Sequence, residues 1–149
     1  MNGDIKIADF GVSGSIRNSQ DFMQNYAGTV SYMSPERILG QNYLSDIDIW
    51  SLAVTLVQCA TGRFPYPDEE DFVSELGFWE LKQYIVEKPS PTLPKNAGFS
   101  QDFHDFLAIC LSKTSGTRSS AKQLIEHPFC LKHANLGENY LKRWIESIE

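Results

Sequence analysis

Asp9, Phe10 and Gly11 are the first residues of the chain whose types and order could do chemistry. They directly follow residues 5–8, where apolar residues alternate with polar or small ones in the pattern of a short β-strand. The aspartate supplies a carboxylate, which is a hard oxygen donor, and the glycine lets the backbone turn sharply. Asp9 could equally be an ordinary turn or cap residue, so its interpretation depends on the rest of the chain.

Other short runs follow this group in a fixed order. Gly28 and Thr29 precede the run YMSPER at residues 32–37, the run DIWS begins at Asp48, and Arg118 comes late in the chain. This ordered set resembles the C-terminal lobe of a eukaryotic protein kinase, over almost the whole chain. Three runs are most similar to the MAP kinase kinases: GVSG at residues 11–14, YMSPER at residues 32–37 and GRFPYP at residues 62–67.

The resemblance implies that the first group binds the cofactors ATP and Mg²⁺. Asp9 would be the metal ligand, holding the Mg²⁺ that bridges the β- and γ-phosphates. Phe10 would pack inward to set the active arrangement, and Gly11 would allow the turn.

The resemblance also implies a substrate-binding (P+1) loop that contains Gly28, Thr29 and Tyr32. Thr29 would form a hydrogen bond near the catalytic base, as in kinases that phosphorylate serine or threonine. The alternative for Thr29 is an ordinary loop hydroxyl.

Three further residues would have structural roles. Glu36 and Arg118 are expected to form a buried ion pair that anchors the end of the activation segment. Asp48 would brace the backbone of the catalytic loop, although stabilising the N-terminus of its own helix is the simpler alternative.

Residues 12–27 are the expected activation loop. MAP kinase kinases are activated by phosphorylation of two hydroxyl residues four apart, and Ser15 and Ser19 have that spacing. Counted back from Gly28, however, the usual positions fall on Asp21 and Asn25. Either the phosphorylation sites have moved, or Asp21 supplies part of the charge permanently, or these are only polar loop residues.

The catalytic machinery of a kinase is incomplete in this sequence. It has no glycine-rich loop, no strand lysine paired with a helix glutamate and no H-R-D…N catalytic loop. No catalytic base is therefore assigned, and the chain alone is expected to be inactive.

The expected function is that of the C-terminal part of an ATP-dependent serine/threonine or dual-specificity kinase. It would phosphorylate a MAP kinase and be activated by an upstream MAP kinase kinase kinase. The alternative is a non-catalytic docking or regulatory module derived from a kinase, in which residues 134–149 provide a docking site. We expect a partial kinase domain over residues 1–131 and a C-terminal helical extension over residues 132–149.

The elements that would position these residues are mainly α-helices. A short β-strand pair is expected at the N-terminal end, as in a partial kinase C-terminal lobe. Cap residues and apolar periodicity predict helices that begin after Ser34, at residues 45–46, near residue 78, after Ser100, at residues 119–120 and near residue 136. We expect Gly62 to end the second helix and Pro128 to stop the fifth.

The second of these helices, residues 46–61, has apolar residues around its whole axis. Such a helix must be buried on nearly all sides, which makes it the central helix of the domain. In the kinase family the helix before the catalytic loop would cover one side of it. Because that helix is absent from this sequence, we expect an exposed apolar surface and a tendency to aggregate.

Composition limits the other function classes. The chain has 149 residues and a net charge of −6, which argues against binding to nucleic acid or to an anionic membrane. No apolar stretch is long enough to span a membrane, and the N-terminus does not resemble a signal peptide. The three widely spaced cysteines suggest reduced thiols in a cytosolic or nuclear protein, and we expect a cytoplasmic location. Nothing in the sequence indicates the oligomeric state.

A zinc site is an alternative use of some of these side chains. His127, Cys130 and His133 are three residues apart, and Cys110 lies upstream. Because Pro128 interrupts this spacing and no C-x-x-C pair is present, simple packing is the preferred interpretation.

Overall fold

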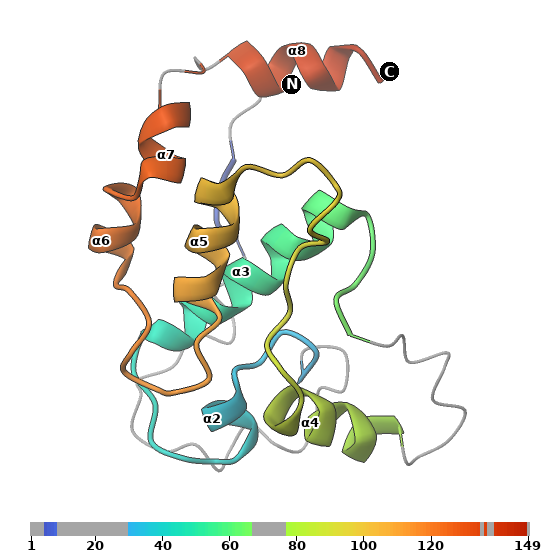
Figure 1. The fold of residues 1–149 in the computed structure, drawn as a ribbon, viewed down its shortest axis with the longest axis vertical. Helices are drawn as coiled ribbons and strands as arrows, with labels where there is room; N and C mark the ends of the chain where they lie inside the picture. Colours follow the sequence, from blue (N-terminus) through green and yellow to red (C-terminus); the bar gives the residue numbers. More distant parts are fainter. Residues whose placement is uncertain (1–4, 9–29, 67–76, 135, 137–138, 149) are drawn as a thin grey trace.

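The computed structural model describes residues 5–8, 30–66, 77–134, 136 and 139–148 of the chain. These residues are mainly helical, as expected (Figure 1). The helices are α2 (Pro35–Ile38), α3 (Asp46–Thr61), α4 (Gly77–Glu87), α5 (Gln101–Cys110), α6 (Ala121–Ile125), α7 (Pro128–His133) and α8 (Asn139–Glu146).

The longest helix, α3, has the predicted bounds. Acidic residues lie in its first turn, where they complement the helix dipole. Gly62 ends it in the left-handed conformation, with a φ of 69°, and donates its backbone N–H to the carbonyl of Gln58 at 2.8 Å. This is the glycine-terminated helix end that the sequence predicted.

Only one side of α3 is buried. Trp50, Ala53, Val54 and Val57 lie in the core, whereas Asp48, Leu52, Thr55 and Cys59 are exposed on the opposite side. The prediction of burial on nearly all sides is therefore wrong, because no element in the described part of the chain covers that side. Exposed Leu52 agrees with the expectation of an uncovered apolar surface.

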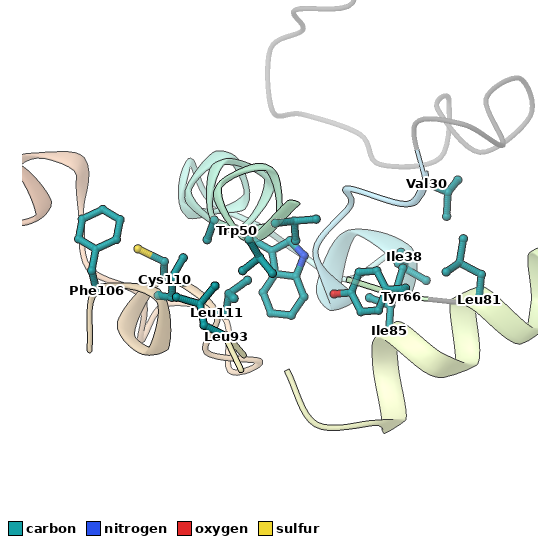
Figure 2. Packing of buried hydrophobic residues seen from close by; sticks show 14 of the residues in the cluster. Val30, Ile38, Trp50, Tyr66, Leu81, Ile85, Leu93, Phe106, Cys110 and Leu111 are labelled. Atoms are coloured by element: carbon teal, nitrogen blue, oxygen red, sulfur yellow. The ribbon is translucent and has the colours of Figure 1, made fainter. Parts of the chain in front are cut away.

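The hydrophobic core extends from α3 in two directions. Figure 2 shows Trp50 between two groups of buried side chains. One group contacts α5 and includes Leu93, Phe106, Cys110 and Leu111, and the other contacts α2 and α4 and includes Val30, Ile38, Tyr66, Leu81 and Ile85. Segments far apart in the sequence are thus joined through one helix.

Serine caps begin α5 and α6 as predicted. The side chain of Ser100 accepts the N–H of Phe103, and Ser120 forms a reciprocal capping box with Gln123. The role of Pro128 differs from the prediction: α6 already ends at Ile125, and Pro128 begins a separate helix, α7. Proline suits the first position of a helix because its φ is preset and its missing N–H would have no helical partner there.

The two ends of the chain differ from expectation. Residues 5–8 do not form a strand, and the described residues contain no strand pair. Ile5 and Ile7 are each 85% exposed, and a strand needs a neighbour to pair its backbone groups.

The last helix, α8, is shorter than predicted and lies at the opposite end of the molecule from α2 and α4 (Figure 1). None of the described helices is long and apolar enough to cross a membrane.

Candidate functional site

Residues 30–34, which we call the anchored segment, lead from the predicted activation loop into α2. The hydroxyl of Ser51 on α3 donates to the backbone carbonyl of Tyr32 at 2.8 Å. The hydroxyl of Tyr32 donates to Oε1 of Gln58, one turn from the end of the same helix, at 2.7 Å. Met33 donates its N–H to the carbonyl of Val30 at 2.9 Å, which closes a turn within the segment. The anchored segment is therefore held along α3 by both backbone and side-chain bonds.

A series of aromatic rings connects this segment to α4. The rings of Tyr32 and Phe64 are 5.4 Å apart, those of Phe64 and Tyr66 are 5.5 Å apart, and those of Tyr66 and Tyr84 are 6.0 Å apart. All three pairs meet edge to face, which is a favourable arrangement for aromatic rings. Burial raises the pKa of the Tyr66 hydroxyl, with a smaller effect from Tyr84, so Tyr66 stays neutral. Tyr32 therefore contacts α3 directly and is linked to α4 only through the rings of Phe64, Tyr66 and Tyr84.

The buried ion pair expected between Glu36 and Arg118 is present. Arg118 Nη1 lies 2.5 Å from Glu36 Oε1, and Nη2 lies 2.8 Å from Oε2, so the guanidinium binds both carboxylate oxygens. Both side chains are buried. The pair joins the first turn of α2 to a loop 82 residues later in the chain.

Opposing effects determine the pKa of Glu36. Burial, the largest of them, raises the pKa because it disfavours the charged form. The hydrogen bonds and the positive charge of Arg118, together with the backbone N–H of Glu36 itself, favour the carboxylate and leave the pKa below its ordinary value. Glu36 is therefore ionised near neutral pH.

Arg118 has further contacts that sequence reasoning missed. Its Nε donates to the carbonyl of Ser112 at 2.8 Å, and its guanidinium lies 5.1 Å from the ring centre of Trp50. A second carboxylate, that of Asp46, lies 3.4 Å from Nη1. From its sequence position, Asp46 was expected only to cap the N-terminus of its own helix. No local pattern could reveal the contact, because 72 residues separate the two side chains.

The remaining predicted site residues fall into two groups. Asp48 is described and is exposed on the open side of α3, so its predicted role in bracing a catalytic loop stays a prediction. The others lie outside the described residues, and their predicted roles are not tested: Asp9, Phe10, Gly11, Ser15, Ser19, Gly28 and Thr29.

The side chains considered for zinc have other contacts. His127 accepts the N–H of Phe129 on its Nδ1, and the ring of His133 packs against that of Phe129. Burial, with a smaller effect from Cys130, raises the pKa of the Cys110 thiol to about 12. Within the described part of the chain, no three histidine, cysteine or acidic side chains come together as a metal site.

Comparison with known proteins identifies the family. The protein kinase domain model matches residues 1–130. This chain belongs to the protein kinase family. It is 44% identical over 139 residues to mitogen-activated protein kinase kinase 2 of Arabidopsis thaliana, covering 92% of this chain and 38% of that protein. It is 37% identical over 163 residues to the dual specificity mitogen-activated protein kinase kinase dSOR1 of Drosophila melanogaster, covering 97% of this chain and 40% of that protein.

These findings confirm the resemblance to MAP kinase kinases that the sequence motifs indicated. A third relative, mitogen-activated protein kinase kinase SIPKK of Nicotiana tabacum, is 41% identical over 134 residues, covering 90% of this chain and 37% of that protein. The kinase chain spans about two fifths of the length of these three relatives.

Proposed function

We propose that this chain is the C-terminal part of a MAP kinase kinase. The complete kinase is a serine/threonine or dual-specificity kinase that transfers the γ-phosphoryl group of ATP, with Mg²⁺, to a MAP kinase. It acts in the cytoplasm and is activated by a MAP kinase kinase kinase. The names of the relatives and the order of the motifs support this proposal.

The anchored segment is the observation that carries the proposal. Tyr32 is bonded to α3, its ring is in contact with Phe64, and the Glu36–Arg118 pair secures the residues that follow. A segment that must present a protein substrate in one geometry needs such rigid support, because misplacement of the reacting group lowers the rate. The family resemblance assigns Tyr32, which lies in this segment, to the substrate-binding loop.

The remaining roles follow the family pattern. Asp9 would hold Mg²⁺, Phe10 and Gly11 would set the position of Asp9, and Thr29 would form a hydrogen bond near the catalytic base. Phosphorylation of the activation loop at Ser15 and Ser19 would activate the kinase by adding charge that can form new hydrogen bonds. The partial kinase domain covers residues 1–131, and residues 132–149 form an extension. Because the catalytic base is not in this sequence, the chain alone has no kinase activity.

A chimera tests this assignment. The chain would replace the matching region of the Arabidopsis relative, so that the missing N-terminal parts come from that protein. We expect the chimera to phosphorylate a MAP kinase with ATP and Mg²⁺, and Asp9→Asn to abolish transfer. A folded chimera without activity would contradict the proposal. Transfer by the 149-residue chain alone, if abolished by Asp9→Asn, would contradict its expected inactivity.

The exposed apolar side of α8 favours a second candidate function, a docking module without catalysis. Tyr140 and Trp144 on α8, and Ile148 two residues beyond its end, follow one another at intervals of four residues and are 58%, 55% and 65% exposed. If docking is the function, the chain binds a purified MAP kinase or upstream kinase, and Trp144→Ala weakens that binding. Glu146→Ala on the same helix is the matched control. Equal binding by the Trp144→Ala variant and the unchanged chain would exclude this surface.

A further inference from the structure

Asp46, at the start of α3, has contacts that leave its own helix. Its Oδ2 accepts the backbone N–H of Gly116 at 3.0 Å and lies 3.4 Å from Nη1 of Arg118. Its backbone carbonyl also lies 3.4 Å from the same nitrogen. The side chain is only 11% exposed. Asp46 therefore joins the N-terminus of α3 to a loop about 70 residues further along the chain.

A second aspartate in the same turn shows that the helix itself does not require this burial. Asp46 and Asp48 both lie in the first turn of α3, but Asp48 is exposed to solvent. An exposed carboxylate already complements the positive end of the helix dipole. Burying a carboxylate costs free energy unless charged or polar partners offset the loss of water, and Oδ1 of Asp46 has no partner. The contacts with Gly116 and Arg118 are the ones that offset this cost.

The loop that receives these contacts, residues 112–118, is here called the arginine loop. Thr117 donates its N–H to the carbonyl of Thr114 at 3.2 Å, and the hydroxyls of Ser112 and Thr117 are 2.6 Å apart. Gly116 has a φ of 79°, a conformation that suits glycine. Arg118 Nε bonds the carbonyl of Ser112, so the position of the guanidinium depends on the position of this loop. Asp46 fixes the loop to α3.

We propose that Asp46 is a positioning residue for the anchored segment. It holds the arginine loop at the backbone of Gly116 and holds the guanidinium at Nη1. This leaves Arg118 oriented so that Nη1 and Nη2 face the two oxygens of Glu36. Through Glu36, the anchored segment keeps its place along α3. The inference rests on the proposed function only in taking that segment to be the substrate-binding loop.

Amide hydrogen exchange on the full 149-residue chain tests the proposal at two positions. The Gly116 amide reports the direct bond to Asp46, and the Met33 amide, bonded to Val30, reports the anchored segment. In Asp46→Ala we expect the protection of Gly116 to fall about tenfold or more, because a hydrogen bond to a charged group is lost. We expect the protection of Met33 to fall as well, by about threefold or more, because local opening becomes easier.

Two further variants separate positioning from general destabilisation. Asp46→Asn keeps an oxygen that can accept the Gly116 N–H but removes the charge facing Arg118. It should leave Gly116 within about threefold of the unchanged chain while the protection of Met33 still falls. Asp48→Asn, which removes the other first-turn charge, should change neither amide. If Asp46→Ala does not fold, Asp46→Asn decides the test.

Unchanged protection of Met33 in Asp46→Asn would overturn the proposal, as would an equal loss in Asp48→Asn. The measurement needs no nucleotide and no protein partner. An inactive chimera with the expected exchange pattern would therefore contradict the proposed function and leave the positioning role intact.

Discussion

Two helices of this molecule, α2 and α8, differ in an unexpected way: the shorter one is buried and the longer one is exposed. The short helix α2 is a single turn, yet Pro35, Glu36 and Ile38 are buried and one of them pairs with Arg118. The longer helix α8 has no buried residue among those described. Lys142 lies 3.9 Å from Glu146, and the hydroxyl of Ser147 bonds the carbonyl of Trp144.

The difference shows where helix stability comes from in this chain. A single turn cannot offset the free energy of helix nucleation by itself, so α2 depends on its tertiary contacts. The amphipathic helix α8 has a suitable sequence but little to pack against among the described residues. Substitutions that remove long-range contacts should therefore affect the free energy of unfolding far more than substitutions on α8.

The largest effect is expected for Arg118→Ala. It leaves the Glu36 carboxylate buried without its partner, which typically costs about 3–5 kcal/mol of stability. Lys132→Ala, which removes the largely exposed ion pair with Asp102, is the matched control and should cost less than about 1 kcal/mol. Urea denaturation of both variants measures the difference. Similar losses of stability in the two variants would show that the buried ion pair contributes no more to the free energy of unfolding than the exposed one.

Acid should weaken the same contact. The pKa of Glu36 in the folded chain lies below its ordinary value, so its contribution is present above the unfolded pKa of about 4.3 and lost as pH falls through the folded pKa. We expect the free energy of unfolding to fall more steeply below about pH 4.3 in the unchanged chain than in Glu36→Gln. Exposed Glu126→Gln is the control and should keep the steep fall. Parallel pH profiles for Glu36→Gln and the unchanged chain would count against this account.

A smaller and local effect is expected at the end of α4. Lys113 Nζ donates to the carbonyl of Val86 at 2.9 Å and also to the carbonyl of Lys88, and burial lowers the pKa of Lys113. Lys113→Met should cost about 1–2 kcal/mol and reduce the exchange protection of the Lys88 amide, which bonds the carbonyl of Tyr84. Lys122→Met, an exposed control on α6, should do neither. An unchanged Lys88 amide would mean that Lys113 does not hold this helix end.

The smallest effect is expected on α8. Trp144 is large but more than half exposed, so Trp144→Ala should change the free energy of unfolding by no more than about 0.5 kcal/mol. Chemical denaturation measures this change. A loss comparable to that of Arg118→Ala would mean that α8 is part of the cooperative core. In that case α8 would contribute as much to the stability of the fold as α2 does.

Helix positions were predictable from the sequence where the signals are local. Ser100 and Ser120 begin their helices and Gly62 ends α3, because caps involve groups only a few residues apart. The prediction of a strand at residues 5–8 is wrong, because a strand depends on hydrogen bonds to a second strand elsewhere in the chain. Pro128 was taken for a stop but begins α7, since proline is compatible with either position.

The candidate site was predictable only in part, for a related reason. The pairing of Glu36 with Arg118 was expected from the family resemblance and is present in the structure. Apolar residues all around α3 indicated burial on nearly all sides, which is wrong for the described residues. The exposed apolar surface was expected only from the kinase resemblance, and exposed Leu52 agrees with it. The contact of Tyr32 with Gln58 and the contact of Asp46 with Gly116 join residues with no recognisable relation in the sequence.

By itself, the sequence determined the kinase family, through the order of its motifs, and most helix boundaries, through local caps. The tertiary structure decided which of two similar aspartates became part of the site. Asp46 and Asp48 lie in the same turn, but two residues along a helix rotate a side chain by about 200°. Only Asp46 faces the arginine loop, and only there do Gly116 and Arg118 offset the cost of burying its charge.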